Sequence, residues 1–186
     1  MRIMKELLGD IPHQFIHQGE EISLQGVSTS GPDQEAYILI RHEQDQWKVS
    51  LVQRGKSFQR YQTENKEVAE VCACLLFRKY QLRFAPFSWA ETDKLVQEGR
   101  MAEVIRQVEQ EMAASVPVSL ENDQAGWHVF CQGDFLCSCA NVMEALRAYR
   151  YMRLLYQHLS EACNRALPLC PQLAAERDHM LLAIIK

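Results

Sequence analysis

The stretch from Gln46 to Tyr80 constrains the fold most, because it joins a strand pattern to a helix pattern. Trp47, Val49 and Leu51 alternate with polar residues, which is typical of a half-buried strand. Gly55 begins the sequence Gly-Lys-Ser, and glycine tolerates the positive φ angles of tight turns. The first part of this stretch therefore predicts a strand, a turn and a return strand.

The second part of the stretch predicts an amphipathic helix. Phe58 and Tyr61 fall on the return strand, and Thr63 is the expected N-cap. Glu64 and Glu67 lie in the expected first turn, where the helix dipole favours acidic side chains. Apolar residues follow at helical spacing: Val68, Val71, Cys72, Leu75 and Leu76. We expect a hairpin with a helix packed on it.

The same order of features returns later in the chain. Trp127-His128-Val129 repeats the Trp-x-Val pattern, Gly133 repeats the turn, and Phe135 repeats the aromatic residue after it. Asn141 and Glu144 form a capping-box variant before a long helix. Its expected apolar face comprises Val142, Leu146, Tyr149, Met152, Leu155, Leu159 and Cys163. This order predicts an internal repeat in which the two tryptophans occupy equivalent places, each hairpin being covered by its helix.

Other segments complete the expected secondary structure. Strands are expected around Ile22 and Leu24 and over Tyr37–His42, so that three or four strands precede the first long helix. Short connections make neighbouring strands antiparallel. The composition predicts a loop at Ser28–Asp33 and linkers at Pro117 and Glu121–Gly126. Further helices are expected over Met1–Gly9, beside Leu95 and Val96, over Met101–Met112 and over Ala174–Ile185.

These elements indicate an α+β fold in which helices pack on an antiparallel sheet. We distinguish the N-terminal strands and helix (1–84), an acidic helical segment (85–126), and the second hairpin with the C-terminal helices (127–186). A chain of 186 residues with 47% hydrophobic residues suits one compact domain that contains all three segments.

Charge and cysteine content limit the classes of partner. The net charge of -4 argues against a nucleic-acid-binding protein. No apolar run has the length of a membrane span, and the N-terminus lacks the core of a signal peptide. Seven cysteines are an odd number, and reduced thiols are their simplest state. We expect a cytoplasmic protein with reduced cysteines and no membrane partner.

One group of cysteines raises the alternative of a metal site. Cys137 and Cys139 would project from one face of a strand, with Cys131 and His128 near in sequence. Structural zinc sites usually contain two cysteines with two to four residues between them and a second such pair at a distance, and this group lacks that spacing. We therefore expect small buried apolar side chains here and no bound metal.

The same group suggests the alternative of a small cysteine hydrolase. His128, Asp134 and either Cys131 or Cys137 would supply base, orienting acid and nucleophile. Asp134 after Gly133 is also ordinary turn chemistry. The chain contains no glycine-rich phosphate loop, H-E-x-x-H or G-x-S-x-G motif. We expect neither an enzyme nor a cofactor; a fast-reacting thiol of lowered pKa would indicate the hydrolase.

The acidic segment is the strongest indication of a binding surface. Residues 85–126 contain eight acidic and three basic residues, an excess of five negative charges. Such a surface attracts a basic partner and raises its association rate, although a solvated helix face is the more common reason for such a run of charges. The expected contact residues are Trp89 as an aromatic anchor with Glu91, Asp93, Glu98, Glu103, Glu109 and Glu111.

The first hairpin carries a resemblance to a known class. The run from Trp47 to Gly55, then Phe58, then Thr63-Glu64 and a helix with Ala69 and Cys72 resembles bacterial immunity proteins of polymorphic toxin systems. In some of those families a strand ends in an E-R-G-like element, and here Gln53 replaces the acid. The resemblance covers Tyr37 to Tyr80 and its motifs are structural.

Immunity proteins bind and block a cognate toxin in the cell that produces it. The resemblance therefore implies a stoichiometric inhibitor of a toxin domain, and the acidic segment suits a toxin with a basic cleft. The alternative within binding proteins is an acidic cytosolic chaperone, which would hold a secreted effector partly unfolded.

Overall fold

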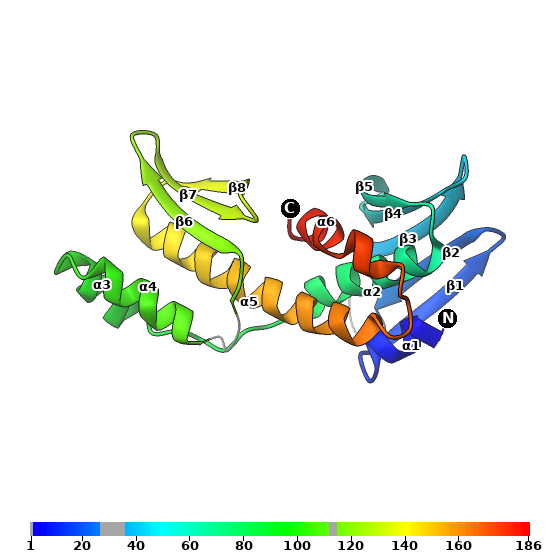
Figure 1. Ribbon diagram of the computed structural model, residues 1–186, viewed down its shortest axis with the longest axis horizontal. Helices are drawn as coiled ribbons and strands as arrows, with labels where there is room; N and C mark the ends of the chain where they lie inside the picture. Colours follow the sequence, from blue (N-terminus) through cyan, green and yellow to red (C-terminus); the bar gives the residue numbers. More distant parts are fainter. Residues whose placement is uncertain (1, 27–35, 112–114) are drawn as a thin grey trace. The chain divides into compact units, whose positions relative to one another are not determined.

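The chain folds into two compact units, seen in a computed structural model that describes residues 2–26, 36–111 and 115–186 (Figure 1). The first unit comprises Met1–Leu82 and Leu159–Lys186, and the second comprises Arg83–His158. The helices and two antiparallel sheets confirm the α+β fold class. The predicted loop at Ser28–Asp33, and Met1 and Met112 of the predicted helices, lie outside the described residues.

The first unit contains a five-stranded sheet in the order β1-β2-β3-β4-β5. Its elements are α1 (Arg2–Leu8), β1 (His13–Gln18), β2 (Glu21–Gly26), β3 (Ala36–Glu43), β4 (Gln46–Gln53), β5 (Lys56–Thr63), α2 (Lys66–Gln81) and α6 (Leu173–Ile185). The antiparallel register aligns Ile22, Ile40, Val49 and Tyr61 across four strands, and all four are buried. This apolar row places the core on one face of the sheet.

Five strands precede the first long helix, so the expectation of three or four was too low. The strand β1 was missed because His13, Gln14, His17 and Gln18 weaken the apolar alternation of its sequence. It lies at the edge of the sheet and pairs only with β2 among the described residues, so half-exposed polar side chains are tolerated there.

The helix α2 begins two residues later than expected, and Thr63 is not its N-cap. The side chain of Asn65 accepts hydrogen bonds from the backbone N–H groups of Glu67 and Val68, at 2.8 and 3.1 Å. Thr63 ends β5, and its hydroxyl donates to the Glu176 carboxylate at 2.9 Å. Asparagine therefore satisfies the free donors of the helix end, while threonine joins β5 to α6.

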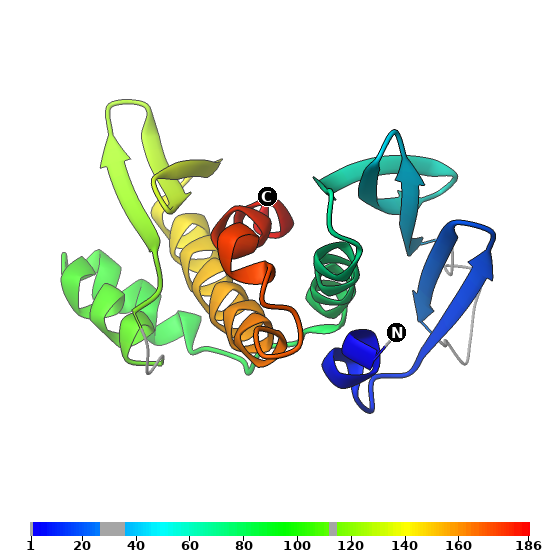
Figure 2. The same cartoon turned by 45° about the vertical axis from the view of Figure 1, so that its right-hand side comes forward.

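The second unit contains a three-stranded sheet beside three helices (Figure 2). The strands are β6 (Val118–Asp123), β7 (Gly126–Cys131) and β8 (Asp134–Cys139), and the helices are α3 (Trp89–Gln97), α4 (Met101–Gln110) and the start of α5 (Val142–Ala166). The strand β6 takes up the first half of the linker expected at Glu121–Gly126, and the next two residues form the turn to β7. Its polar end pairs fully with β7, so backbone pairing overrides the loop-like composition.

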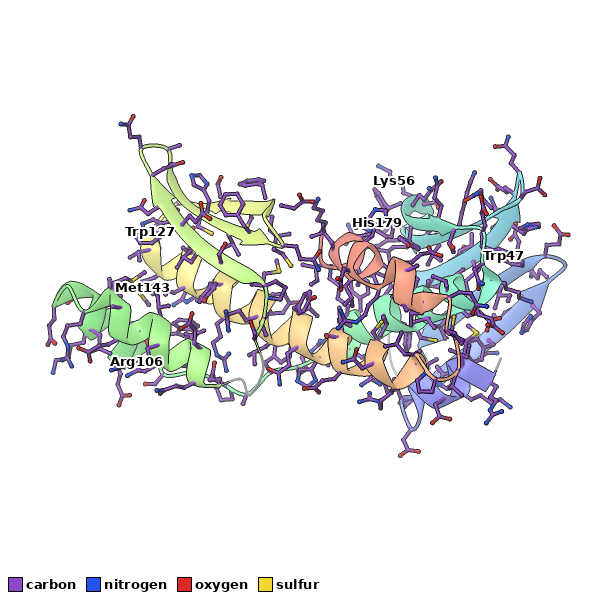
Figure 3. The ribbon with its side chains drawn as sticks, viewed as in Figure 1. Trp47, Lys56, Arg106, Trp127, Met143 and His179 are labelled. Carbon is purple, nitrogen blue, oxygen red and sulfur yellow. The ribbon has the colours of Figure 1, made fainter. Side chains whose placement is uncertain are left out.

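The two hairpins have matching registers, which confirms the predicted repeat of strands and turns. Trp47 pairs with Thr63 and Trp127 with Cys139, and a β-bulge follows two residues after each tryptophan. The turns Arg54-Gly55 and Gln132-Gly133 both have positive φ at their two residues, as two-residue hairpin loops of type I′ require. Both tryptophans lie on their sheets in Figure 3. The shared unit is a three-strand meander, β3–β5 or β6–β8.

A helix follows each meander through the same connection. Each begins two residues after the last strand residue with an asparagine cap, Asn65 in one unit and Asn141 in the other. The Glu144 carboxylate also accepts, at 3.1 Å, the N–H of Ala140, which is the residue before the cap, whereas a capping box uses the N–H of the cap residue itself. The helix α2 packs on β3, β4 and β5, and α5 reaches its own sheet through Arg153, which donates to the Val118 carbonyl at 3.2 Å.

None of the helices formed by the described residues is long and apolar enough to cross a membrane.

If the two units share one folding pattern, their N-caps should contribute alike. We expect Asn65→Ala and Asn141→Ala each to lower the free energy of unfolding by about 1 kcal/mol, because each leaves helix N–H donors unsatisfied. Chemical denaturation of both variants, with Asn122→Ala on an exposed strand position as control, measures this. A loss at only one cap would contradict the equivalence.

Candidate partner-binding surface

The acidic segment forms a pair of helices, α3 and α4, joined at Gly99. Gly99 has a φ of 73° and follows the end of α3, a position that glycine occupies readily because it tolerates positive φ. On α4, Val104 and Val108 are fully buried, while Met101 and Ile105 are half-buried. The apolar side of α4 therefore faces inward and leaves its acidic residues at its edges and outer face.

Glu111 is bound to a buried arginine of α5. Arg150 is only 8% exposed, and its guanidinium donates to both Glu111 carboxylate oxygens at 2.8 and 2.9 Å. It also donates to the Ala85 carbonyl at 2.9 Å and lies 4.9 Å from the centre of the Phe87 ring. A bidentate pair of this kind is strong and geometrically specific. Glu111 thus joins the end of α4 to α5.

Glu109 is bound through a tyrosine to a second buried arginine. The Tyr149 hydroxyl donates to the Glu109 carboxylate at 3.1 Å and accepts from Arg153 at 3.0 Å. Burial raises the pKa of Tyr149, so it remains a neutral donor. Arg153 is 7% exposed and is otherwise held by the Val116 and Val118 carbonyls. A hydrogen-bonded series therefore runs from the buried Arg153 through the Tyr149 hydroxyl to the Glu109 carboxylate.

Glu98 and Glu103 share one exposed arginine. Arg100 donates to the two Glu103 oxygens at 2.7 and 2.6 Å and to Glu98 at 3.1 Å. The hydrogen bonds from Arg100 to Glu103 lower the pKa of the Glu103 carboxyl. The Arg100 side chain is 48% exposed, so solvent screens the group and a partner's charge can compete for it.

The remaining predicted contact residues lie on α3. The Trp89 ring is half-buried, with the Phe87 ring centre 4.8 Å away and the Arg147 guanidinium over its own face at 5.5 Å. Asp93 is exposed and accepts a hydrogen bond from the neutral Gln97 amide at 3.0 Å. Glu91 is exposed as well. Within the part of the chain that the structure describes, no cation lies within ion-pair distance of Glu91 or Asp93.

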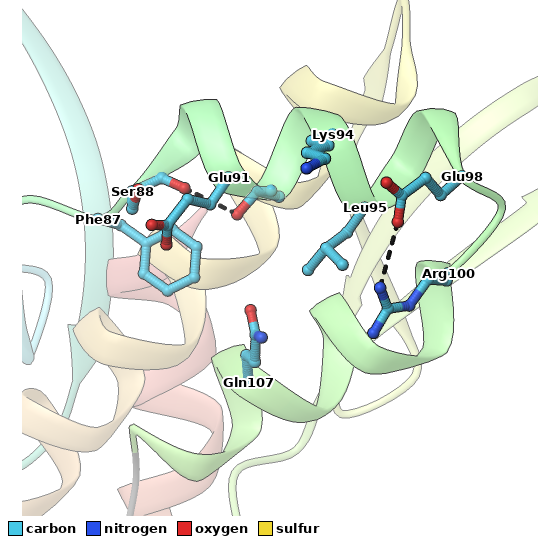
Figure 4. A pocket seen from close by; sticks show the side chains of 9 residues that line it. Phe87, Ser88, Glu91, Lys94, Leu95, Glu98, Arg100 and Gln107 are labelled. Atoms are coloured by element: carbon cyan, nitrogen blue, oxygen red, sulfur yellow. Dashed lines mark hydrogen bonds and ion pairs between the residues drawn. The ribbon is translucent and has the colours of Figure 1, made fainter.

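A cavity of about 500 Å³ lies between α3 and α4 (Figure 4). Two of the predicted contact residues, Glu91 and Glu98, line it near opposite ends. The complete lining is Phe87, Ser88, Glu91, Thr92, Lys94, Leu95, Glu98, Arg100 and Gln107. This combination of apolar and charged side chains was not predicted, because Gln107 of α4 joins the α3 residues only when the two helices pack together.

The predicted cysteine–histidine group separates onto two faces of the second sheet. His128 faces Asp123 and Ser138, with its Nε2 and Nδ1 atoms each 3.0 Å from their oxygens. Side chains alternate along a strand, so Cys131, Cys137 and Cys139 project from the opposite face. The proposed nucleophiles therefore point away from the proposed base. The Asp123–His128–Ser138 chain ties three neighbouring strands together.

Burial, rather than an activating neighbour, sets the direction of the pKa shift of five cysteine thiols. Burial raises the pKa of Cys139 and of Cys163 to about 11, and it also raises the pKa of Cys72, Cys74 and Cys170. A raised pKa lowers the thiolate fraction at neutral pH, which is opposite to the behaviour of a catalytic cysteine. All seven cysteines lie among the described residues, and none forms a disulfide there.

No metal-binding group of three or more His, Cys, Asp or Glu side chains occurs within residues 2–26, 36–111 and 115–186. No protein-family model, curated protein or solved structure matches the chain.

The buried and exposed acid–arginine pairs should differ sharply in their effect on stability. Glu111→Gln leaves the buried Arg150 charge uncompensated, and we expect a loss of about 2–3 kcal/mol in the free energy of unfolding. Glu103→Gln makes the same chemical change in the solvent-screened pair with Arg100, and we expect a much smaller loss. Equal losses in urea denaturation would show that Arg150 does not hold the helices together.

Proposed function

We propose that this protein is a stoichiometric inhibitor of the immunity type, which binds a cognate bacterial toxin domain and occludes its active site. The supporting observation is the acidic face of α3, where Glu91 and Asp93 are exposed and have no cation partner within the described part of the chain. The sequence resemblance to immunity proteins lies in the first meander and α2, which would form the scaffold of the fold.

The distribution of internal partners favours α3 over α4 as the main contact. Glu111 pairs with the buried Arg150, and Glu109 accepts a hydrogen bond from Tyr149, so both carboxylates are engaged within the second unit. Glu98 and Glu103 share Arg100 and form a screened rim. The uncompensated negative charge of the helical pair therefore lies on α3, and this charge would attract a basic toxin cleft.

In this proposal, Trp89 is not the exposed aromatic anchor that the sequence analysis expected. Its ring already contacts Phe87 and lies under Arg147, at the start of α3. These contacts fix the first turn of the helix that carries Glu91 and Asp93. Trp89 would therefore support the binding face through packing, with its exposed edge alone reaching the partner.

The proposal predicts a salt-sensitive loss of toxin binding on charge reversal. We expect Glu91→Lys with Asp93→Lys to slow association with the cognate toxin at least about tenfold at low salt, with a smaller effect at high salt, because screening shortens the reach of the charges. Stopped-flow association at two salt concentrations and the survival of toxin-expressing cells measure this.

The matched control is Glu6→Lys with Asp10→Lys, which makes the same charge change at exposed positions of the first unit. This control variant should associate at nearly the wild-type rate. If both double variants slow association equally, net charge alone acts and α3 is not the contact. If the wild-type chain neither binds the toxin nor protects cells, the immunity function is refuted.

A further inference from the structure

We propose that the cavity between α3 and α4 receives one lysine or arginine side chain of the partner protein. The partner class rests on the function proposed above, while the cavity and its chemistry rest on the geometry of the second unit. Its volume of about 500 Å³ falls within the roughly 300–1,000 Å³ of typical ligand pockets.

The lining provides a place for the carbon stem of such a side chain. Phe87 and Leu95 line the interior, and the Gln107 side chain points into the space from α4 (Figure 4). Long cationic side chains bury their methylene stems on apolar surface while the charged group contacts polar atoms. The buried Thr92 hydroxyl already donates a hydrogen bond to the Ser88 carbonyl at 3.1 Å, so it does not need a ligand atom as its acceptor.

The charges of the lining are unequal at the two ends of the cavity. Glu98 is neutralised by Arg100 at 3.1 Å, whereas Glu91, at the end near Phe87, has no cation within ion-pair distance in the described residues. A bound guanidinium or ammonium group would therefore lie at the Glu91 end, where the carboxylate and the Gln107 amide oxygen can accept its hydrogen bonds.

Other classes of occupant fit this lining less well. At the Phe87 end, an anion would meet the Glu91 carboxylate, and an apolar side chain would cover that carboxylate without providing a hydrogen bond. Lys94 lies on the rim, three residues after Glu91 on α3, and its ammonium group repels an incoming cation. Removal of that charge should therefore strengthen binding.

The test uses the full chain and the probe N-acetyl-arginine amide, with N-acetyl-citrulline amide as the neutral analogue of the same shape. We expect saturable chemical-shift changes in two-dimensional NMR spectra, confined to α3, α4 and Phe87–Ser88, with the arginine probe. The citrulline analogue should bind about tenfold or more weakly, because it cannot form a charge-assisted hydrogen bond.

Three single variants locate the site. Glu91→Gln should weaken binding of the arginine probe about tenfold or more, and Lys94→Met should strengthen it. Asp93→Asn removes the same charge from the same helix outside the cavity lining, and should change binding less than about threefold. All three positions are exposed, so the variants retain the fold.

The proposal is overturned if the arginine probe does not saturate, or if Glu91→Gln and Asp93→Asn weaken binding equally. It is also overturned if the wild-type chain protects cells from the toxin and the Glu91→Gln variant protects them equally well and associates with the toxin at the same rate. If the probe binds as expected but the chain protects no cell, the immunity function fails and the cation-binding cavity stands.

Discussion

The charge of Arg150 is the constraint on which the second unit depends. A guanidinium that is 8% exposed needs a carboxylate and further acceptors, and Glu111 and the Ala85 carbonyl supply them. This requirement fixes the chain on both sides of the helical pair, before α3 and after α4. The same requirement at Arg153 engages Glu109 through Tyr149. Buried cations of α5 thus determine which acidic side chains remain for a partner.

The repeated meander shows how local rules produce the same unit twice. Both hairpins combine a Trp-x-Val strand, a two-residue turn with positive φ and a bulge, and an asparagine then caps the helix. The sequences around these features differ, and so do the helices. The middle of α2 is buried almost all round, whereas α5 carries the two buried arginines. The unit is therefore a shared scaffold with different inner faces.

Much of the fold could be predicted because its signals are local. The Trp-x-Val strands, the glycine turns and the helix periodicity are each patterns of residues close together in the sequence. These patterns predicted both hairpins and the helices that follow them. The strands β1 and β6 were missed because their polar residues become acceptable only when a neighbouring strand pairs with them. Thr63 was mistaken for the N-cap because it is two residues from the true cap and has suitable chemistry.

The candidate site was predicted only in outline. The excess of acidic residues was visible in the sequence, but their division into engaged and uncompensated carboxylates was not. Arg150 and Glu111 lie 39 residues apart, and Tyr149 and Glu109 lie 40 apart. Such pairs depend on the packing of α5 against α4, which no local pattern encodes. The cavity likewise requires both helices, since Gln107 and Leu95 meet only in the folded chain.

The central claim is that α3 forms the contact with a basic partner. Hydrogen–deuterium exchange of the complex with the cognate toxin domain, compared with the free chain, tests this most directly. The account predicts slower exchange of the backbone amides of Trp89–Gln97 and Gln107 in the complex, with little change in β1 to β5. Unchanged exchange in α3, with protection confined to the first unit or to β6–β8, would contradict it.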